Sequence, residues 1–173
     1  MTSLEQQLAK AKSDAEKMQI CLEAVKQNGY ALKDVPENLK TLELCLEAVK
    51  YFGYALEFVP EKIKTAELCA VAVRNSGLYL HFVPENLKTA ELCLEAIKQD
   101  GRALHYVPKV LKTAELCLEA VKQNGFALQS VPGKLKTLEL CIEAVKQYNR
   151  AIRFVPNVMK EEVRKAVKQG GGK

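Results

Sequence analysis

The sequence predicts an all-α fold, an α-helical solenoid of six 24-residue repeats with helical caps. Three observations predict it. A nine-residue segment, CLEAVKQNG, occurs both at Cys21–Gly29 and at Cys117–Gly125. Val-Pro pairs recur every 24 residues, with their prolines at Pro36, Pro60, Pro84, Pro108, Pro132 and Pro156. The cysteines keep the same step, at Cys21, Cys45, Cys69, Cys93, Cys117 and Cys141. A fixed period of this length is typical of stacked repeats that cannot bury their apolar faces alone.

Each repeat begins with a longer helix. In the repeat that starts at Thr41, this threonine is a favourable N-cap, and Glu43 lies at the positive end of the helix dipole. The apolar arc of the helix is wide and consists of Leu44, Cys45, Leu46, Ala48 and Val49. So wide an arc indicates a helix that is covered on several sides, by its own repeat and by both neighbours.

A glycine follows each longer helix, and we interpret it as a left-handed C′ cap. The last repeat has Asn149 at this position, and asparagine also tolerates a left-handed backbone. The predicted caps are Gly29, Gly53, Gly77, Gly101, Gly125 and Asn149.

A second, shorter helix comes next, for example Tyr54–Phe58. It must end before Val59, because a residue that precedes proline is disfavoured in the helical region. The following PEKIK segment predicts one turn of 3₁₀ helix that folds Ile63 onto the core.

The predicted domain organisation follows from these elements. We expect an N-terminal helical cap at 1–16, with capping boxes at Ser3 with Gln6 and Ser13 with Glu16. The six-repeat solenoid spans 17–160, a C-terminal capping helix spans 161–169, and 170–173 form a flexible tail.

The alternation of ELCLEAVKQNG with ALxxVPxxLK resembles an uncharacterised repeat family, a domain of unknown function. The resemblance covers about Lys17 to Lys160 and implies an α-helical repeat array with no activity attached. The 24-residue design is also similar in architecture to leucine-rich variant repeats.

Composition favours a soluble intracellular protein. Hydrophobic residues make up 48% of the chain and the net charge is +5. The longest apolar run is far shorter than the roughly 20 residues that cross a bilayer, and no signal peptide is recognised.

The periodic cysteines have no C-x-x-C spacing and lie among apolar neighbours. This pattern favours cysteines buried in the core and a reducing compartment such as the cytoplasm. We expect a monomer by default.

The sequence predicts no enzyme, cofactor or metal site, because no nucleophile–base set and no Gly-rich phosphate loop occurs. His81 and His105 occupy the same position in adjacent repeats, where two imidazoles could begin a metal site. No third ligand column accompanies them, so solvated histidines are favoured.

Basic residues form two columns that would suit nucleic acid. The first comprises Lys26, Lys50, Arg74, Lys98, Lys122 and Lys146, and the second Lys40, Lys64, Lys88, Lys112, Lys136 and Lys160. In the first column Glu47 precedes Lys50 by three residues, and this pair recurs in every repeat except the third. Local ion pairing therefore competes with phosphate binding as an explanation.

The first and fifth residues of the shorter helix vary most between repeats. With the two histidines beside them, they form a candidate binding ridge of aromatic and arginine residues, types that dominate protein interfaces. Its members are Tyr30, Tyr54, Phe58, Leu78, His81, Phe82, Arg102, His105, Tyr106, Phe126, Arg150 and Phe154. The alternative is that Phe58, Phe82 and Phe154 merely seal the junctions between repeats.

We therefore expect a non-catalytic scaffold that binds protein or peptide along this ridge. The alternatives are single-stranded nucleic-acid binding by the lysine columns and the ridge, and an idealised or engineered array without a ligand.

Overall fold

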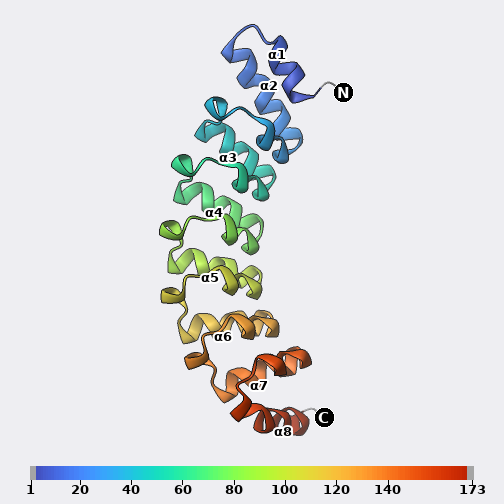
Figure 1. Ribbon diagram of the computed structural model, residues 1–173, viewed down its shortest axis with the longest axis vertical. Helices are drawn as coiled ribbons and strands as arrows, with labels where there is room; N and C mark the ends of the chain where they lie inside the picture. The colour runs from blue at the N-terminus through green and yellow to red at the C-terminus, as the bar shows by residue number, and fades with distance from the viewer. Residues whose placement is uncertain (1–2, 171–173) are drawn as a thin grey trace. The chain divides into compact units, whose positions relative to one another are not determined.

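The computed structural model describes residues 3–170, and these residues form helices and turns without a strand. The predicted all-α repeat solenoid is confirmed (Figure 1). The chain divides into two compact units, one ending at Leu87 and the other beginning at Lys88. Unit 1 contains the first three repeats and unit 2 contains the last three, and each is described by itself.

Each repeat contains one α-helix, one longer 3₁₀ helix and one single-turn 3₁₀ helix, and the helices α1 and α8 flank the six repeats. The α-helices are α1 (Leu4–Lys10), α2 (Asp14–Gln27), α3 (Leu42–Tyr51), α4 (Ala66–Asn75), α5 (Ala90–Gln99), α6 (Ala114–Gln123), α7 (Leu138–Gln147) and α8 (Lys160–Gly170). The longer 3₁₀ helices are η1 (Gly29–Asp34), η3 (Gly53–Phe58), η5 (Gly77–Phe82), η7 (Gly101–Tyr106), η9 (Gly125–Ser130) and η11 (Asn149–Phe154). The single turns are η2 (Glu37–Leu39), η4 (Glu61–Ile63), η6 (Glu85–Leu87), η8 (Lys109–Leu111), η10 (Gly133–Leu135) and η12 (Asn157–Met159).

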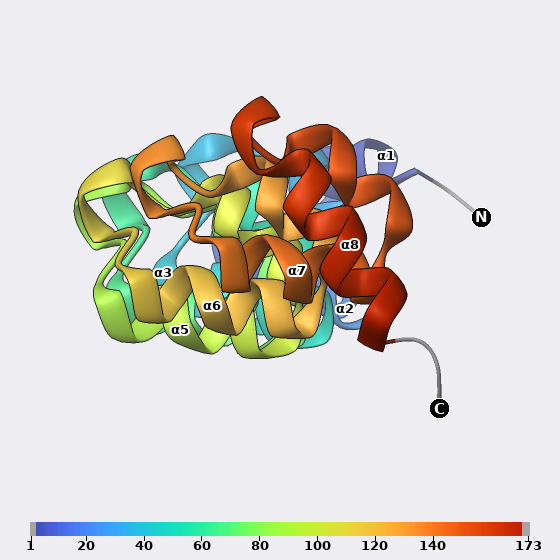
Figure 2. The same cartoon turned by 90° about the horizontal axis from the view of Figure 1, so that it is seen from below.

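Within each unit the α-helices pack in one layer and the longer 3₁₀ helices in another. In unit 2, α5 packs on α6 and α6 on α7, while η9 lies between η7 and η11 (Figure 2). The core lies between the two layers. In the second repeat it is made by residues without exposed surface, namely Leu44, Cys45, Ala48, Val49, Ala55 and Leu56.

The predicted N-caps are confirmed. The hydroxyl of Thr41 accepts a hydrogen bond of 3.2 Å from the Leu44 backbone N–H, and the equivalent threonines do the same in the later repeats. At the N-terminus, Ser3 and Gln6 form both bonds of a capping box. Ser13 accepts from the Glu16 N–H at 3.1 Å, but the Glu16 carboxylate accepts from the Lys12 N–H at 2.7 Å, so this box is completed one residue earlier than predicted.

The predicted left-handed caps are wrong. None of the described residues has a positive φ angle, and this includes Gly29, Gly53, Gly77, Gly101, Gly125 and Asn149. The α-helix ends where predicted, because Phe52 is the C-cap of α3 and Gly53 follows it as C′. Phe52 is extended, at φ −149° and ψ 91°, and it also begins the following 3₁₀ helix.

Close approach of the next repeat explains Gly29, Gly53, Gly101 and Gly125. A Cβ added at Gly29 would lie 2.6 Å from the Ala48 carbonyl oxygen, and at Gly101 and Gly125 it would overlap the carbonyl oxygens of Ala120 and Ala144. Glycine is therefore required because there is no space for a side chain. Asn149, in the sixth repeat, is exposed, and the helix α8 follows this repeat.

The second helix of each repeat is a 3₁₀ helix that starts at the glycine. In the second repeat it spans Gly53–Phe58, and the extended Val59 ends it as predicted. The predicted single turn after the proline is also confirmed, at Glu61–Ile63.

The expected C-terminal capping segment, 161–169, lies within α8, which packs on α7. Val163 of α8 has no exposed surface. Of the expected tail, Gly170 ends α8, and residues 171–173 lie outside the described part of the chain. No helix among the described residues is long and apolar enough to cross a membrane.

Candidate binding ridge

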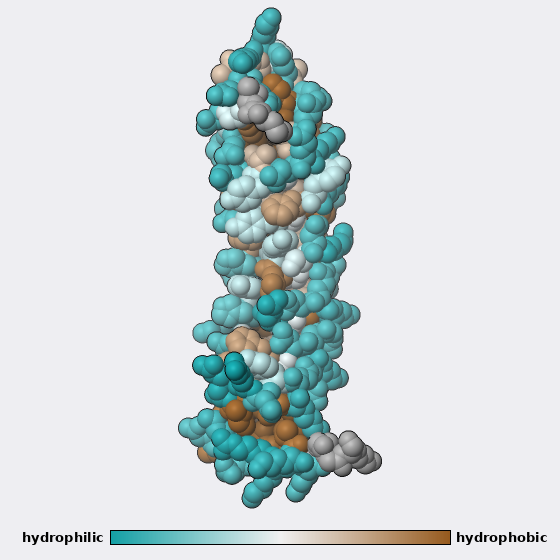
Figure 3. All heavy atoms as spheres, turned by 90° about the vertical axis from the view of Figure 1, so that its right-hand side faces the viewer, coloured by the Kyte–Doolittle hydropathy of each residue, from teal (hydrophilic) through white to brown (hydrophobic). Residues whose placement is uncertain are grey.

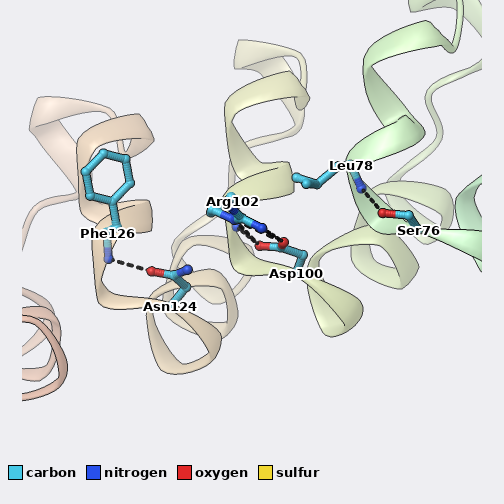
Figure 4. Close-up of polar contacts among 6 residues, drawn as sticks. All are labelled: Ser76, Leu78, Asp100, Arg102, Asn124 and Phe126. Carbon is cyan, nitrogen blue, oxygen red and sulfur yellow. Dashed lines mark hydrogen bonds and ion pairs between the residues drawn. The ribbon is translucent and has the colours of Figure 1, made fainter. Parts of the chain in front are cut away.

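The ridge positions are the residue after each glycine and the last residue of each longer 3₁₀ helix. In four of the six repeats, a polar side chain just before the glycine accepts a hydrogen bond from the backbone N–H of the first of them. Asn28 Oδ1 accepts from the Tyr30 N–H at 3.0 Å, and Asn124 Oδ1 accepts from the Phe126 N–H at 3.0 Å. Figure 4 shows the same arrangement at Ser76, Asp100 and Asn124. The cap binds the backbone N–H group, so it does not require a particular side chain at the ridge position.

A lysine of the preceding repeat fixes the last ridge position. Its ammonium group donates to the final carbonyl of the 3₁₀ helix, a group that would otherwise lack a partner at the helix end. The bonds are Lys64 to Phe82 O (3.3 Å), Lys88 to Tyr106 O (3.0 Å), Lys112 to Ser130 O (3.1 Å) and Lys136 to Phe154 O (2.8 Å). These members of the second basic column therefore hold adjacent repeats together, a role that sequence reasoning missed.

The lysine caps differ in their acidic partners. Lys40 and Lys64 form ion pairs with Glu37 (2.7 Å) and Glu61 (2.6 Å), and their side chains are 8% and 6% exposed. The position of Glu61 is occupied by Lys109 in the fourth repeat. Burial lowers the pKa of Lys112, and the charge of Lys109 lowers this pKa further. Burial also lowers the pKa of Lys136.

Ridge rings of unit 1 meet across repeats. The Tyr30 and Phe58 ring centroids are 5.1 Å apart, as are those of Tyr54 and Phe82, and both pairs are edge-to-face. Tyr30 also stacks on Tyr54 at 6.1 Å. These rings seal the junctions, as the alternative interpretation proposed, and still reach the surface: Tyr30 is 40% exposed and the other three are half-buried. Figure 3 shows one face of the molecule on which rings and apolar side chains interrupt a hydrophilic surface.

Unit 2 has fewer rings on its ridge. Phe126 and Phe154 repeat the edge-to-face contact at 5.3 Å. Arg102 instead binds Asp100 in its own repeat, with Nε 3.0 Å from both carboxylate oxygens and Nη2 2.6 Å from Oδ2 (Figure 4). The hydrogen bond from Arg102 lowers the pKa of Asp100. Arg150 is exposed, and Leu78, in unit 1, is half-buried.

Sequence reasoning missed three rings beside the ridge. Tyr79, where most repeats have alanine, packs edge-to-face on Tyr54 at 6.2 Å. Phe52 and Tyr148 occupy the position of the polar cap, and they lie 6.0 Å from Tyr54 and Phe126 respectively. The sequence signal for these rings was that Phe52, Tyr79 and Tyr148 depart from the repeat consensus. The three rings widen the aromatic surface at two places.

The two histidines of the ridge are exposed. His81 lies 5.0 Å from the Phe82 ring, and His105 Nδ1 lies 3.4 Å from Ser130 Oγ. Among residues 3–170, no group of three or more histidine, cysteine or acidic side chains could hold a metal ion.

The first basic column is exposed along its length. The expected local pair occurs at Lys50, whose ammonium lies 2.8 Å from Glu47. In the last two repeats the corresponding carboxylates accept hydrogen bonds from glutamines, Glu119 from Gln123 at 3.4 Å and Glu143 from Gln147 at 2.9 Å. The expected local ion pair is thus shown in the second repeat.

The six cysteines are buried and unbridged, as the sequence predicts. Burial raises the pKa of the thiols of Cys21, Cys117 and Cys141, and it raises the pKa to about 11 at Cys45 and Cys69. A raised pKa keeps the thiol protonated at neutral pH, which makes it a poor nucleophile and metal ligand.

A hollow of about 500 Å³ opens beside the ridge in unit 2. Arg102 and the rings of Phe126 and Tyr148 line it, together with the amides of Gln123, Asn124 and Gln147. Gln147 Nε2 donates to the Lys122 carbonyl at 2.9 Å, which ties this wall to the preceding repeat. The hollow offers rings and amide groups without an isolated charge, because Asp100 neutralises Arg102.

Comparison with known proteins yields one family. No curated protein and no solved structure matches the chain. The family model described as "Domain of unknown function (DUF4116)" matches residues 18–64, 67–112 and 114–160, so each match covers about two of the 24-residue repeats. Because these segments together make up most of the sequence and share the repeat architecture, the chain belongs to the DUF4116 family of domains of unknown function.

Proposed function

We propose that this chain is a non-catalytic scaffold that binds protein or peptide segments along the ridge. The observation that supports the proposal is that, at the ridge positions, backbone groups make hydrogen bonds while the side chains differ. Polar caps bind the backbone N–H groups of Tyr30, Leu78, Arg102 and Phe126, and lysines bind the backbone carbonyls of Phe82, Tyr106, Ser130 and Phe154, although the side chains at these positions differ. The side chains themselves range from tyrosine and phenylalanine to arginine and serine, so they can vary without loss of the repeat contacts.

The ridge chemistry suits a protein partner. Partly exposed tyrosines and phenylalanines supply large contact areas at low cost in conformational entropy, and arginine adds directional hydrogen bonds. The buried, unbridged cysteines suit a reducing compartment, and the cytoplasm is the proposed location. A monomer is the proposed form.

Single-stranded nucleic acid is the second candidate, and the exposed first basic column favours it together with rings on which bases can stack. Nucleic acid is the weaker candidate because the ammonium groups of lysines of the second column donate hydrogen bonds to backbone carbonyls. The basic surface that could contact phosphates is correspondingly smaller.

The test is a peptide-display selection on the intact chain, followed by titration of the selected peptides with Tyr54→Ala. Removing this ridge ring should weaken binding by about tenfold or more, as at other interface hot spots. Tyr51→Ala is the matched control, because Tyr51 is 59% exposed on α3 and lies outside the ridge. Equal affinity for both variants would contradict the ridge as the binding surface.

A titration with mixed-sequence single-stranded RNA separates the second candidate. Binding that falls steeply with salt, and is lost when Lys50, Arg74 and Lys98 are neutralised, would favour nucleic acid. Failure of both the peptide selection and the RNA titration would favour an array without a ligand, natural or engineered.

A further inference from the structure

A second surface lies in unit 2, on the α-helical layer rather than on the ridge. A groove of about 460 Å³ runs between α5 and α6. Its apolar walls come from Leu94 of α5, Leu111 of η8 and Leu116 of α6. Leu116 is buried, while Leu94 and Leu111 are half-buried and leave apolar surface facing the opening. The volume lies within the range of ligand pockets and accommodates a leucine-sized or phenylalanine-sized side chain.

The rim of the groove is acidic. Glu91, Glu115 and Glu119 line it, and Lys98 is the one basic residue among the lining residues. A smaller hollow of about 330 Å³ adjoins it along α5 and adds Glu95. The chain as a whole carries a net charge of +5, so this groove concentrates negative charge on a basic protein.

The helix starts keep two of the rim carboxylates ionised. A backbone N–H and the hydroxyl of Thr89 lower the pKa of Glu91, and a backbone N–H and the hydroxyl of Thr113 lower that of Glu115. Both glutamates lie in the first turn of their helices, where the dipole favours negative charge. The rim is therefore anionic at neutral pH.

We propose that the α5–α6 groove binds a basic amphipathic segment of a partner protein. An apolar side chain of the segment fills the leucine-lined floor, and lysines or arginines on either side meet the glutamate rim. Charge complementarity selects this occupant, because an acidic segment would be repelled and a neutral apolar ligand would leave the carboxylates unused. The inference concerns a surface separate from the ridge and does not depend on the proposed function there.

The test uses a fluorescein-labelled peptide of alternating lysine and leucine pairs, titrated by fluorescence anisotropy at low salt. Two analogues carry glutamate for lysine and serine for leucine. We expect the parent peptide to bind, each analogue to bind about tenfold more weakly or worse, and the affinity to fall as salt rises.

Variants locate the site. Glu115→Gln with Glu119→Gln should weaken binding by about fivefold or more, since it removes most of the rim charge on α6. Glu5→Gln with Glu162→Gln is the charge-matched control, because both residues are exposed on other helices. Leu94→Ala should also weaken binding, whereas Leu118→Ala, the same change one repeat later, should not.

Three results would overturn the proposal. One is the absence of binding by the parent peptide, and another is an equal loss in the two charge-matched double variants. The third is loss of binding in Tyr54→Ala with the groove variants unaffected, which would assign the peptide to the ridge.

Sedimentation of the chain alone tests whether a second copy occupies the groove. A dimer that the Glu115→Gln and Glu119→Gln pair dissociates would mean that a second copy, and not the proposed partner, occupies the groove. Circular dichroism melting confirms that each variant is folded.

Discussion

The junction between the second and third repeats, in unit 1, differs instructively from that between the fourth and fifth, in unit 2. Both have a lysine cap, from Lys64 to the Phe82 carbonyl in one and from Lys112 to the Ser130 carbonyl in the other. Both have a glycine, Gly53 or Gly101, at which a Cβ would collide with the next repeat.

The difference lies in the ridge side chains. The first junction has the Tyr54–Phe82 ring contact at 5.1 Å, whereas the second has Arg102, bound to Asp100 in its own repeat, and Ser130. The two junctions therefore share a lysine-to-carbonyl hydrogen bond and a close approach of the next repeat to the glycine. The ring contact is an addition at the first junction that the second junction lacks.

The largest effect should come from breaking a shared contact. Gly101→Val forces a side chain onto the Ala120 carbonyl oxygen, so we expect a loss of about 3 kcal/mol or more in the free energy of unfolding. Urea unfolding followed by circular dichroism measures it. An unchanged midpoint would show that the repeats can separate here at little cost.

Two matched substitutions distinguish the two explanations of the glycine column, steric crowding and a left-handed backbone. A Cβ at Gly133 meets nothing within 4 Å, so Gly133→Ala should be neutral or stabilise by about 0.5 kcal/mol. Asn149→Ala should also be nearly neutral, because Asn149 is exposed and has a negative φ. A clear loss at Asn149 would instead support a left-handed cap.

The glycines also show what the sequence can predict. The 24-residue period and the Thr, Cys and Pro columns predict the repeat, its helix starts and its core, because these depend on contacts within one repeat or its equivalent in the next. A glycine column shows that a Cβ is not tolerated. It does not reveal whether a positive φ or a neighbouring carbonyl group excludes the Cβ. Asn149 suggested a positive φ, which is wrong.

The candidate site was predictable in part for the same reason. Variation between repeats identified the ridge positions, yet Phe52, Tyr79 and Tyr148 lie in columns that are otherwise polar or small. The lysine caps were hidden because each ammonium meets a carbonyl 18 residues later in the chain, a contact that no local spacing rule describes. The α5–α6 groove likewise exists only once two helices are placed side by side.

A smaller effect should separate the two lysine caps. Lys64→Met removes the bond to the Phe82 carbonyl and the ion pair with Glu61, so we expect a loss of about 1 to 3 kcal/mol. Lys112→Met should cost less, about 1 kcal/mol, because burial already disfavours the charge of Lys112 and Lys109 repels it. Denaturant unfolding of both variants measures the difference, and equal losses would show that the acidic partner contributes nothing.

The pH dependence sharpens this comparison. The pKa of Lys112 is lower in the folded than in the unfolded chain, so the penalty for its buried charge is present below the folded pKa. The penalty disappears as pH rises toward the unfolded value of about 10.4. Wild type should therefore gain stability relative to Lys112→Met as the solution becomes alkaline. A constant gap would contradict the lowered pKa.

An effect smaller than the loss of either lysine cap should come from giving unit 2 the missing acid. Lys109→Glu places a carboxylate three residues before Lys112, as Glu61 is placed before Lys64, and it removes a neighbouring positive charge. We expect a gain of about 0.5 to 1 kcal/mol, limited because the carboxylate is exposed, and a gain that shrinks with added salt. Glu61→Lys in unit 1 is the reciprocal change and should cost a similar amount. If one substitution changes stability and its reciprocal does not, the two lysine caps differ in more than their acidic partner, and the backbone junctions of the two units are not equivalent.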